Sequence, residues 1–392
     1  MKPLVGVTAL ASLALGTPAH AGIELVTKVG YPDELATVRL RDVGDPRYVA
    51  ITAMSRADNE LAADVLDLAT GTTHRIAVSR RTVERALGAT NLEGELVSYT
   101  PAKVGLHITD GILERARHHW YVELDVKTGK VARSVSLGTF GDDAELVFVA
   151  TDGARDTAWF TLATYAEGLH NFSHVHGPTA LVLRKLDLGT LQATDAMTIT
   201  LPGRPMSSGY EDQLSVHHAP DYSWFAITEY DEKAFRSKPA AQVYFLDPDH
   251  GASFAVPALD TTYGIAFARD NAYAYLGSSQ LGTIARVDLA AHKIDKTVTG
   301  PTLTHDFAIS PNGSKLFVIG SSRQYGELAL PALGGRTARK HDPAVAPGAE
   351  QLSGGGHVSS DGRYYVLREA MTVHEDKTVG DPHRLVVAKI TD

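Results

Sequence analysis

Apolar and polar positions alternate along most of this chain in short runs that end at Gly, Pro, Asn or Asp, the pattern of β-strands joined by tight turns. One phrase recurs: an apolar strand, a turn built on Asp or Asn, and a second strand rich in aromatic and β-branched residues. Copies of it occupy residues 149–162, 219–227, 309–319 and 358–367. A strand-only phrase that recurs every 40 to 60 residues or so, roughly one blade length, indicates a β-propeller.

A second phrase strengthens this interpretation. It reads apolar-Asp-apolar and is usually followed within three residues by Gly. The copies have their acidic residue at Asp67, Asp125, Asp187, Asp247 and Asp288. The Asp side chain can accept hydrogen bonds from backbone amides in a tight turn, and Gly allows a positive φ. We therefore expect a hairpin between the two outer strands of each blade.

Interleaving the two phrases gives one inner and one outer hairpin per unit, which is a four-stranded blade. The predicted fold is an all-β, seven-bladed β-propeller. Its units start near Tyr48, Leu96, Leu146, Leu214, Ile265, Phe307 and His357. Residues 23–29 form an additional strand that we expect to pair into the C-terminal blade and close the ring, since an open ring would expose a sheet edge. One or two helical turns are predicted at residues 79–87.

The segment 304–318 resembles the YVTN-type propeller repeat, with its Ala-Ile-Ser-Pro-Asn-Gly turn followed by Lys-Leu-Phe-Val, and residues 263–288 look like the adjoining copy. The resemblance covers roughly residues 263–367, and the first two blades lack the Ser-Pro-Asp-Gly turn. It implies a secreted propeller similar to the YncE-like and surface-layer-like groups or to lactonase-type propellers. One propeller fold hosts many functions, so the resemblance implies a fold more than an activity.

The chain has 392 residues, a net charge of −9 and no cysteine. The acidic balance argues against nucleic acid or an anionic membrane as the partner, and the lack of cysteine excludes disulfides and thiolate chemistry. Residues 1–21 resemble a secretory signal peptide cleaved after Ala21, and their apolar run is too short for a transmembrane anchor. We therefore expect a periplasmic or secreted monomer with one propeller domain over residues 22–392.

A propeller binds ligands at its axis, on the face formed by the loops that enter the inner strands and those that join second to third strands. By repeat alignment, the entry loops carry Glu211, Asp212, Tyr263, His305 and Asp306, and the second-to-third loops carry Arg323, Arg368 and Glu369. Groups of both charges would suit a polar small molecule, a glycan or a protein loop, with Arg binding carboxylate or phosphate through two hydrogen bonds. The alternative is a solvated channel mouth.

Two histidine groups are candidate metal ligands. His170, His174 and His176 follow one another with strand-like spacing, which suits Zn²⁺ or Cu²⁺. His217 and His357 fall at the same inner-strand position and could approach His305 near the axis. A polar loop without metal and a structural role for His305 are the alternatives. No cofactor is required by the fold, and a divalent metal (Zn, Cu or Ca) is a possibility that the spacing leaves open.

The first functional hypothesis is a binding or scaffold module. The alternative is an enzyme, either a lactonase-like hydrolase in which Glu211 or Asp212 would act with His305 as base and acid, or a metal-dependent enzyme that uses the central histidines. A purely structural surface protein is a third hypothesis. No Gly-x-Ser-x-Gly motif is present, so a serine nucleophile has no support from the sequence.

Overall fold

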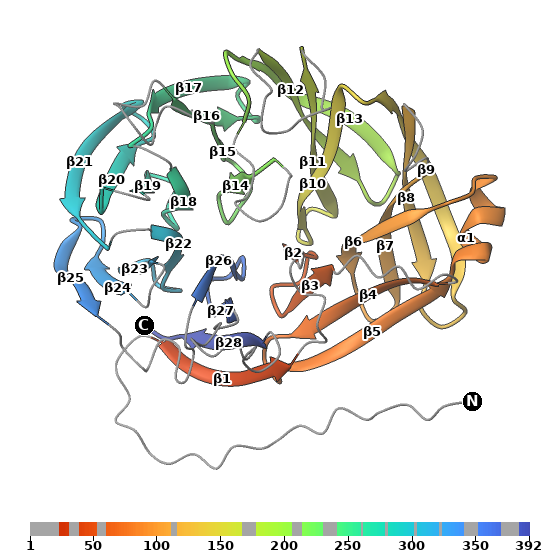
Figure 1. The fold of residues 1–392 in the computed structure, drawn as a ribbon, viewed down its shortest axis with the longest axis horizontal. Helices are drawn as coiled ribbons and strands as arrows, with labels where there is room; N and C mark the ends of the chain where they lie inside the picture. The colour runs from red at the N-terminus through yellow and green to blue at the C-terminus, as the bar shows by residue number, and fades with distance from the viewer. Residues whose placement is uncertain are drawn as a thin grey trace, which may run out of the picture.

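The computed structural model describes residues 23–30, 39–52, 60–110, 116–166, 178–205, 214–229, 241–259, 262–278, 281–301, 304–320, 324–340, 352–369 and 384–392. Within these ranges, seven four-stranded antiparallel sheets stand as blades around a common axis (Figure 1). One strand of each blade lies near the axis and its fourth strand lies at the rim. This arrangement confirms the predicted all-β, seven-bladed propeller.

The first four blades use consecutive strands. Blade 1 contains β2 (Arg39–Asp42), β3 (Tyr48–Thr52), β4 (Glu60–Asp67) and β5 (Thr72–Ser79). Blade 2 contains β6 (Glu93–Tyr99), β7 (Lys103–Thr109), β8 (Ala116–Asp125) and β9 (Lys130–Gly141). Blade 3 contains β10 (Ala144–Asp152), β11 (Thr157–Tyr165), β12 (Thr179–Asp187) and β13 (Gln192–Leu201). Blade 4 contains β14 (Val216–His218), β15 (Phe225–Thr228), β16 (Gln242–Asp247) and β17 (Ala252–Pro257).

The last three blades complete the ring. Blade 5 contains β18 (Thr262–Phe267), β19 (Tyr273–Ser278), β20 (Thr283–Asp288) and β21 (Lys293–Thr299). Blade 6 contains β22 (Thr304–Ile309), β23 (Lys315–Gly320), β24 (Gln324–Ala329) and β25 (Gly334–Lys340). Blade 7 contains β26 (Leu352–Val358), β27 (Tyr364–Glu369), β28 (Arg384–Ile390) and, as its outer strand, β1 (Ile23–Gly30).

The two ends of the chain close the ring together. β1 pairs antiparallel with β28, as the sequence predicts, so blade 7 has strands from both termini. The predicted start of the first unit is wrong by one strand: Tyr48 begins β3, and the inner strand β2 begins at Arg39. β2 is short and reads Arg-Leu-Arg-Asp, so it lacks the apolar alternation by which the other inner strands are recognised.

The outer hairpins have the predicted turn chemistry. Each of the five repeated Asp side chains accepts a hydrogen bond from a backbone amide two or three residues later, at Ala69, Thr128, Thr190, His250 and Ala291. Gly71, Gly129 and Gly251 follow with positive φ. In the two copies without Gly at this position, Leu191 and His292 adopt the same left-handed conformation. The turn is therefore set by the Asp, and Gly lowers its cost where it is present.

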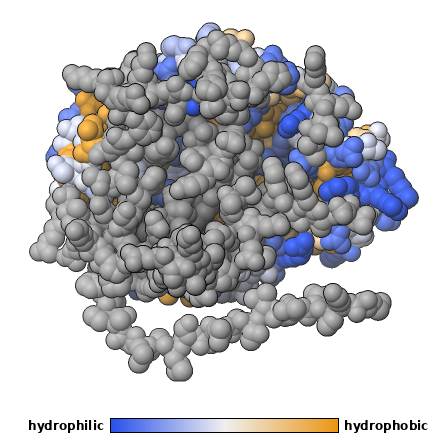
Figure 2. Space-filling view, viewed as in Figure 1, coloured by the Kyte–Doolittle hydropathy of each residue, from blue (hydrophilic) through white to orange (hydrophobic). Residues whose placement is uncertain are grey.

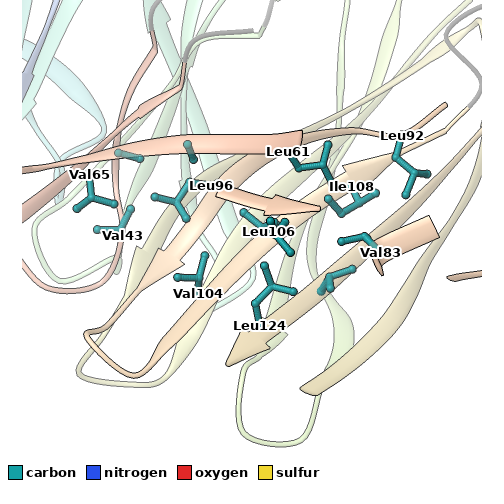
Figure 3. Packing of buried hydrophobic residues seen from close by; sticks show 14 residues of the cluster. Val43, Leu61, Val65, Val83, Leu92, Leu96, Val104, Leu106, Ile108 and Leu124 are labelled. Atoms are coloured by element: carbon teal, nitrogen blue, oxygen red, sulfur yellow. The ribbon is translucent and has the colours of Figure 1, made fainter. Parts of the chain in front are cut away.

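One helix, α1 (Arg80–Leu87), follows β5 and agrees with the predicted helical turns. It ends at Gly88, which has φ 68° and donates its amide to the carbonyl of Glu84. Val83 is buried against the apolar cluster between blades 1 and 2 (Figure 3). The opposite side of α1 carries exposed Arg81 and Arg85 and contributes to the hydrophilic edge of the molecule in Figure 2.

The core lies between the blades. Each apolar cluster combines strands of two neighbouring blades; the cluster in Figure 3, for example, combines Val43, Leu61 and Val65 of blade 1 with Leu106 and Leu124 of blade 2. Similar clusters join blade 7 to blade 1 and blade 5 to blade 6. Stability therefore comes from blade-to-blade packing, and side chains near the inner strands are placed by these contacts. Among the described residues, no helix is long and apolar enough to cross a membrane.

Candidate functional site

Five inner strands end in the same register. In blades 1, 4, 5, 6 and 7 the last residue of the inner strand pairs with the second strand at the same offset, as Asp42 does with Val49 and Ile309 with Leu316. The final two residues are Ala266 and Phe267 in blade 5, Ala308 and Ile309 in blade 6, Arg41 and Asp42 in blade 1, His217 and His218 in blade 4, and His357 and Val358 in blade 7. Ionisable side chains thus occupy positions that are apolar elsewhere.

Asp42 is the centre of this group. Its Oδ1 lies 3.1 Å from Nε2 of His357 in blade 7, and its Oδ2 lies 3.5 Å from Nε2 of His218 in blade 4. The Asp42 side chain is only 5% exposed. Burial alone would raise the pKa of Asp42, but the charges and hydrogen bonds of His357 and His218 outweigh it and hold this pKa well below its usual range. The carboxyl group is therefore ionised at neutral pH.

The backbone that follows Asp42 is held in place by blades 2 and 3. Val43 is buried, and its carbonyl accepts a hydrogen bond from the amide of Tyr99 in blade 2 (3.0 Å). Gly44, with φ 101°, forms a parallel bridge with Asp152 of blade 3. A Cβ on Gly153 would stand 2.2 Å from the carbonyl oxygen of Gly44, so this approach needs glycine there. The end of β2 is thus held against blades 2 and 3, while Asp42 contacts blades 4 and 7.

His218 is fixed on several sides. Its Nδ1 lies 3.0 Å from the carbonyl oxygen of Ala219, and its ring stacks on Tyr222 with centroids 4.7 Å apart. The Tyr222 hydroxyl donates to the carbonyl of Thr151 in blade 3 (2.9 Å), and burial raises the pKa of Tyr222. His218 therefore belongs to a packed joint between blades 3 and 4.

His217 lies on the other face of the same strand, because successive side chains of a strand point to opposite faces. Its Nε2 is 3.4 Å from Oγ of Ser215, and burial, with the charge of His218 adding to it, lowers the pKa of His217 to about 4. The structure thus brings His218, and not His217, to Asp42 and through it to His357. Repeat register alone had predicted that His217 would approach His357.

A second buried polar chain runs outward through blade 2. Nη1 of Arg41 lies 3.0 Å from Oε1 of Glu95, which also lies 2.9 Å from Nδ1 of His107. Nε2 of His107 in turn lies 2.9 Å from Nδ1 of His119. Burial, with His107 adding to it, lowers the pKa of His119 to about 3, so this ring is neutral at pH 7. β2 therefore places opposite charges on its two faces, Arg41 toward blade 2 and Asp42 toward blades 7 and 4.

Asp42, Arg41, Glu95, His107 and His119 were not among the residues predicted from the sequence. One signal could have identified the histidines: each stands among apolar residues of a strand, His107 between Leu106 and Ile108, and His119 beside Trp120 and Tyr121. Asp42 gave no such signal, because β2 itself was not recognised as a strand.

Three of the predicted axial residues lie outside the described part of the chain, and four have only their backbone described. Glu211, Asp212 and Arg323, and the candidate metal ligands His170, His174 and His176, all lie outside the described residues. For Tyr263, His305, Arg368 and Glu369 the structure describes the backbone only, in β18, β22 and β27. The hydrolase hypothesis rests on Glu211, Asp212 and His305, so the described side chains add nothing to it.

Asp306 is the predicted axial residue whose side-chain contact the structure describes. Its Oδ2 accepts a hydrogen bond from the amide of Gly356 (3.2 Å), which links blade 6 to blade 7. A Cβ on Gly356 would stand 2.6 Å from the hydroxyl oxygen of Tyr365, so glycine makes room for this buried ring. Burial and the nearby Asp306 raise the pKa of Tyr365 well above its ordinary value. Asp306 is therefore engaged in a blade-to-blade contact.

No set of three His, Asp or Glu side chains within the described residues is arranged to hold a metal ion. In particular, Asp42 is hydrogen-bonded to His357 at 3.1 Å and lies 3.5 Å from His218. The predicted cluster of His217, His357 and His305 stays a prediction, because the side chain of His305 is outside the described residues.

Comparisons with known proteins support the fold alone. No family model matches the chain, and no curated protein matches it. Among solved structures 1211 chains match, so the architecture is a common one. One of them belongs to the crystal structure of the mitotic checkpoint complex: it is 12% identical with a TM-score of 0.52, and the match covers 100% of this chain and 99% of that chain. At this identity the likeness shows a propeller and carries no residue role.

Proposed function

We propose that this protein is a secreted or periplasmic propeller, related to the YVTN-type group, that binds a polar ligand or a loop of a protein partner at its axis. One observation carries the proposal: blades 1, 4 and 7 bring Asp42, His218 and His357 together at strand positions that are Ala, Phe or Ile in blades 5 and 6.

The energetics favour a functional reason for this group. Taking a carboxylate and two imidazoles out of water is costly, and well-packed apolar residues at such positions are often as stable or more so. Phe267 and Ile309 show that the same register accepts apolar side chains in this very ring. Buried ionisable groups with shifted pKa values are enriched at binding and catalytic sites. We infer that the axis is the binding region.

The arginines that we expect at the ligand stay part of this proposal. Arg368 is the penultimate residue of strand β27 and lies near the start of the inner strand, since its backbone pairs with Ser353 of β26. By repeat alignment, Arg323 belongs to the loop that joins the second and third strands of blade 6. Together they would supply two forked donors from adjacent blades.

Binding can be tested on the mature chain, residues 22–392, by a thermal-shift screen with sugars, polyols, carboxylates and phosphates, followed by calorimetry. We expect a ligand whose affinity falls in an Arg323→Ala, Arg368→Ala variant or an Asp42→Asn variant, and is unchanged in the surface control Arg81→Ala. A ligand that binds all variants equally would place the site elsewhere. The proposed export is tested separately, by mass spectrometry of the exported protein, which should begin at Gly22.

A further inference from the structure

The two axial histidines, His218 and His357, are similarly exposed, but their ring nitrogens have different partners. The side chains of His218 and His357 are 17% and 15% exposed. Both approach the ionised carboxylate of Asp42, which only accepts hydrogen bonds. They differ in what their other ring nitrogen does, and this difference decides which of them is available to a ligand.

Both ring nitrogens of His218 face protein oxygens. Its Nδ1 lies 3.0 Å from the carbonyl oxygen of Ala219, and its Nε2 lies 3.5 Å from Oδ2 of Asp42. With the ring also stacked on Tyr222, His218 has no nitrogen directed away from the protein.

His357 has one nitrogen engaged. Its Nε2 lies 3.1 Å from Oδ1 of Asp42 and must carry the proton of that hydrogen bond. In the neutral ring this leaves a lone pair on Nδ1. Within the described residues, Asp42 is the only hydrogen-bonding partner of the His357 ring, so its Nδ1 faces no donor of this part of the protein.

We propose that His357 is the ligand-contacting group of the axial site, that Asp42 is the positioning residue that fixes its tautomer, and that the ligand is a neutral hydrogen-bond donor such as the hydroxyl of a polyol or glycan. This inference rests on the proposed function and narrows its ligand class. A carboxylate has no hydrogen to give to the Nδ1 lone pair, whereas a hydroxyl group does.

The tautomer assignment can be tested without knowing the ligand. Diethyl pyrocarbonate acylates an unprotonated imidazole nitrogen, and peptide mass spectrometry locates the product. Exposure alone predicts equal modification of His218 and His357, whereas their hydrogen bonds predict modification of His357 and protection of His218. His250, whose side chain is 79% exposed, is the positive control. Equal modification of the two axial rings, or an unmodified His357, would overturn the proposal.

Nitrogen-15 spectra of protein labelled at histidine give a second readout. We expect an unprotonated Nδ1 and a protonated Nε2 for His357, with its signals assigned from a His357→Gln variant. Titration with glycerol, as a plain hydroxyl probe, should move the Nδ1 signal of His357 and leave that of His218 in place. In Asp42→Asn, His357 should show mixed tautomers, a change that a merely structural role for Asp42 would not produce.

Ligand binding then separates this inference from the proposed function. For a ligand found in the screen, we expect His357→Gln to weaken binding about threefold to tenfold, the usual worth of one hydrogen bond, and His217→Gln to leave it unchanged. Unchanged affinity in His357→Gln overturns the assignment of His357 while axial binding stands. A screen without any ligand refutes the proposed function, and selective modification of His357 would still establish the tautomer.

Discussion

The joint between blades 7 and 1 and the joint between blades 5 and 6 use the same strand positions with different chemistry. Both contain an apolar cluster shared by the two blades. At the inner end, blade 6 has Ala308 and Ile309, both buried, whereas blade 1 has Arg41 and Asp42. The charged pair is bound on both faces, Arg41 to Glu95 and Asp42 to His357.

The ring can therefore close without charged side chains at the ends of its inner strands. Blades 5 and 6 close on each other with apolar side chains alone at the equivalent positions. Blades 1, 2, 4 and 7 instead depend on partners that must stay ionised or stay neutral, and their stability is therefore sensitive to pH and to the loss of a single partner.

The largest effect should come from acid. The folded protein holds His119 and His217 neutral, with pKa values of about 3 and about 4, while the unfolded chain protonates them near 6.5. The unfolded state therefore binds more protons below pH 6.5, so stability is complete above that pH and falls between pH 6.5 and about 3. Together the two sites should cost several kcal/mol, on the order of 1.4 kcal/mol per pKa unit for each.

This acid effect is measured as the free energy of unfolding by urea at pH 7 and pH 5. A His119→Gln, His217→Gln double variant should be markedly less sensitive to this change of pH. The exposed His250→Gln is the control and should leave the slope as in the parent protein. An unchanged slope in the double variant would contradict the assignment of neutral buried rings.

Glu95→Ala should cost about 4 kcal/mol of unfolding free energy, because it leaves the guanidinium of Arg41 buried without its carboxylate. Replacing both partners, as Arg41→Met with Glu95→Leu, should recover much of the lost stability. The contact between blades 1 and 2 would then be apolar, like the contact between blades 5 and 6. Urea denaturation measures both. A double variant as unstable as the single one would show that packing, and not the unpaired charge, sets the cost.

Ile309→Ala should cost about 3 kcal/mol, since it removes a buried side chain from the cluster between blades 5 and 6. Unlike the effect of Glu95→Ala, this loss should be the same at pH 7 and pH 5, because no neighbouring charge is left unpaired. Ile309→Val is the matched control, with an expected cost of about 1 kcal/mol. A strong pH dependence of the Ile309→Ala loss would break the comparison.

The smallest effect concerns two glycine turns. Gly362 and Gly251 have similar positive φ values, 70° and 64°. A Cβ on Gly362 would overlap the guanidinium of Arg269, which donates to the carbonyl of Ser360 (2.7 Å), whereas nothing lies within 4 Å of a Cβ on Gly251. We expect Gly251→Ala to cost about 1 kcal/mol from backbone strain and Gly362→Ala about 2 kcal/mol, because the Arg269 contact is also displaced. Equal melting temperatures would show that Arg269 adjusts freely.

Local patterns in the sequence were enough to predict the blades. Asp67 and its four counterparts cap their turns as expected, and residues 23–29 close the ring against β28. These features depend on a few neighbouring residues or on one regular alternation, and the same solution repeats around the ring. The misplaced start of blade 1 has the same explanation, since β2 carries charges where the pattern calls for apolar residues.

The axial group was out of reach of such patterns. Whether His217 or His218 meets His357 depends on which strand face each occupies, and a shift of one residue exchanges the faces. The partner, Asp42, lies more than 300 positions from His357 in the chain, at the joint where the ring closes. Turn chemistry and alternation are properties of contiguous residues, and the chain by itself therefore determined seven blades and their hairpins. Only the closed ring decided which ionisable side chains meet at its centre, because packing between blades sets those contacts.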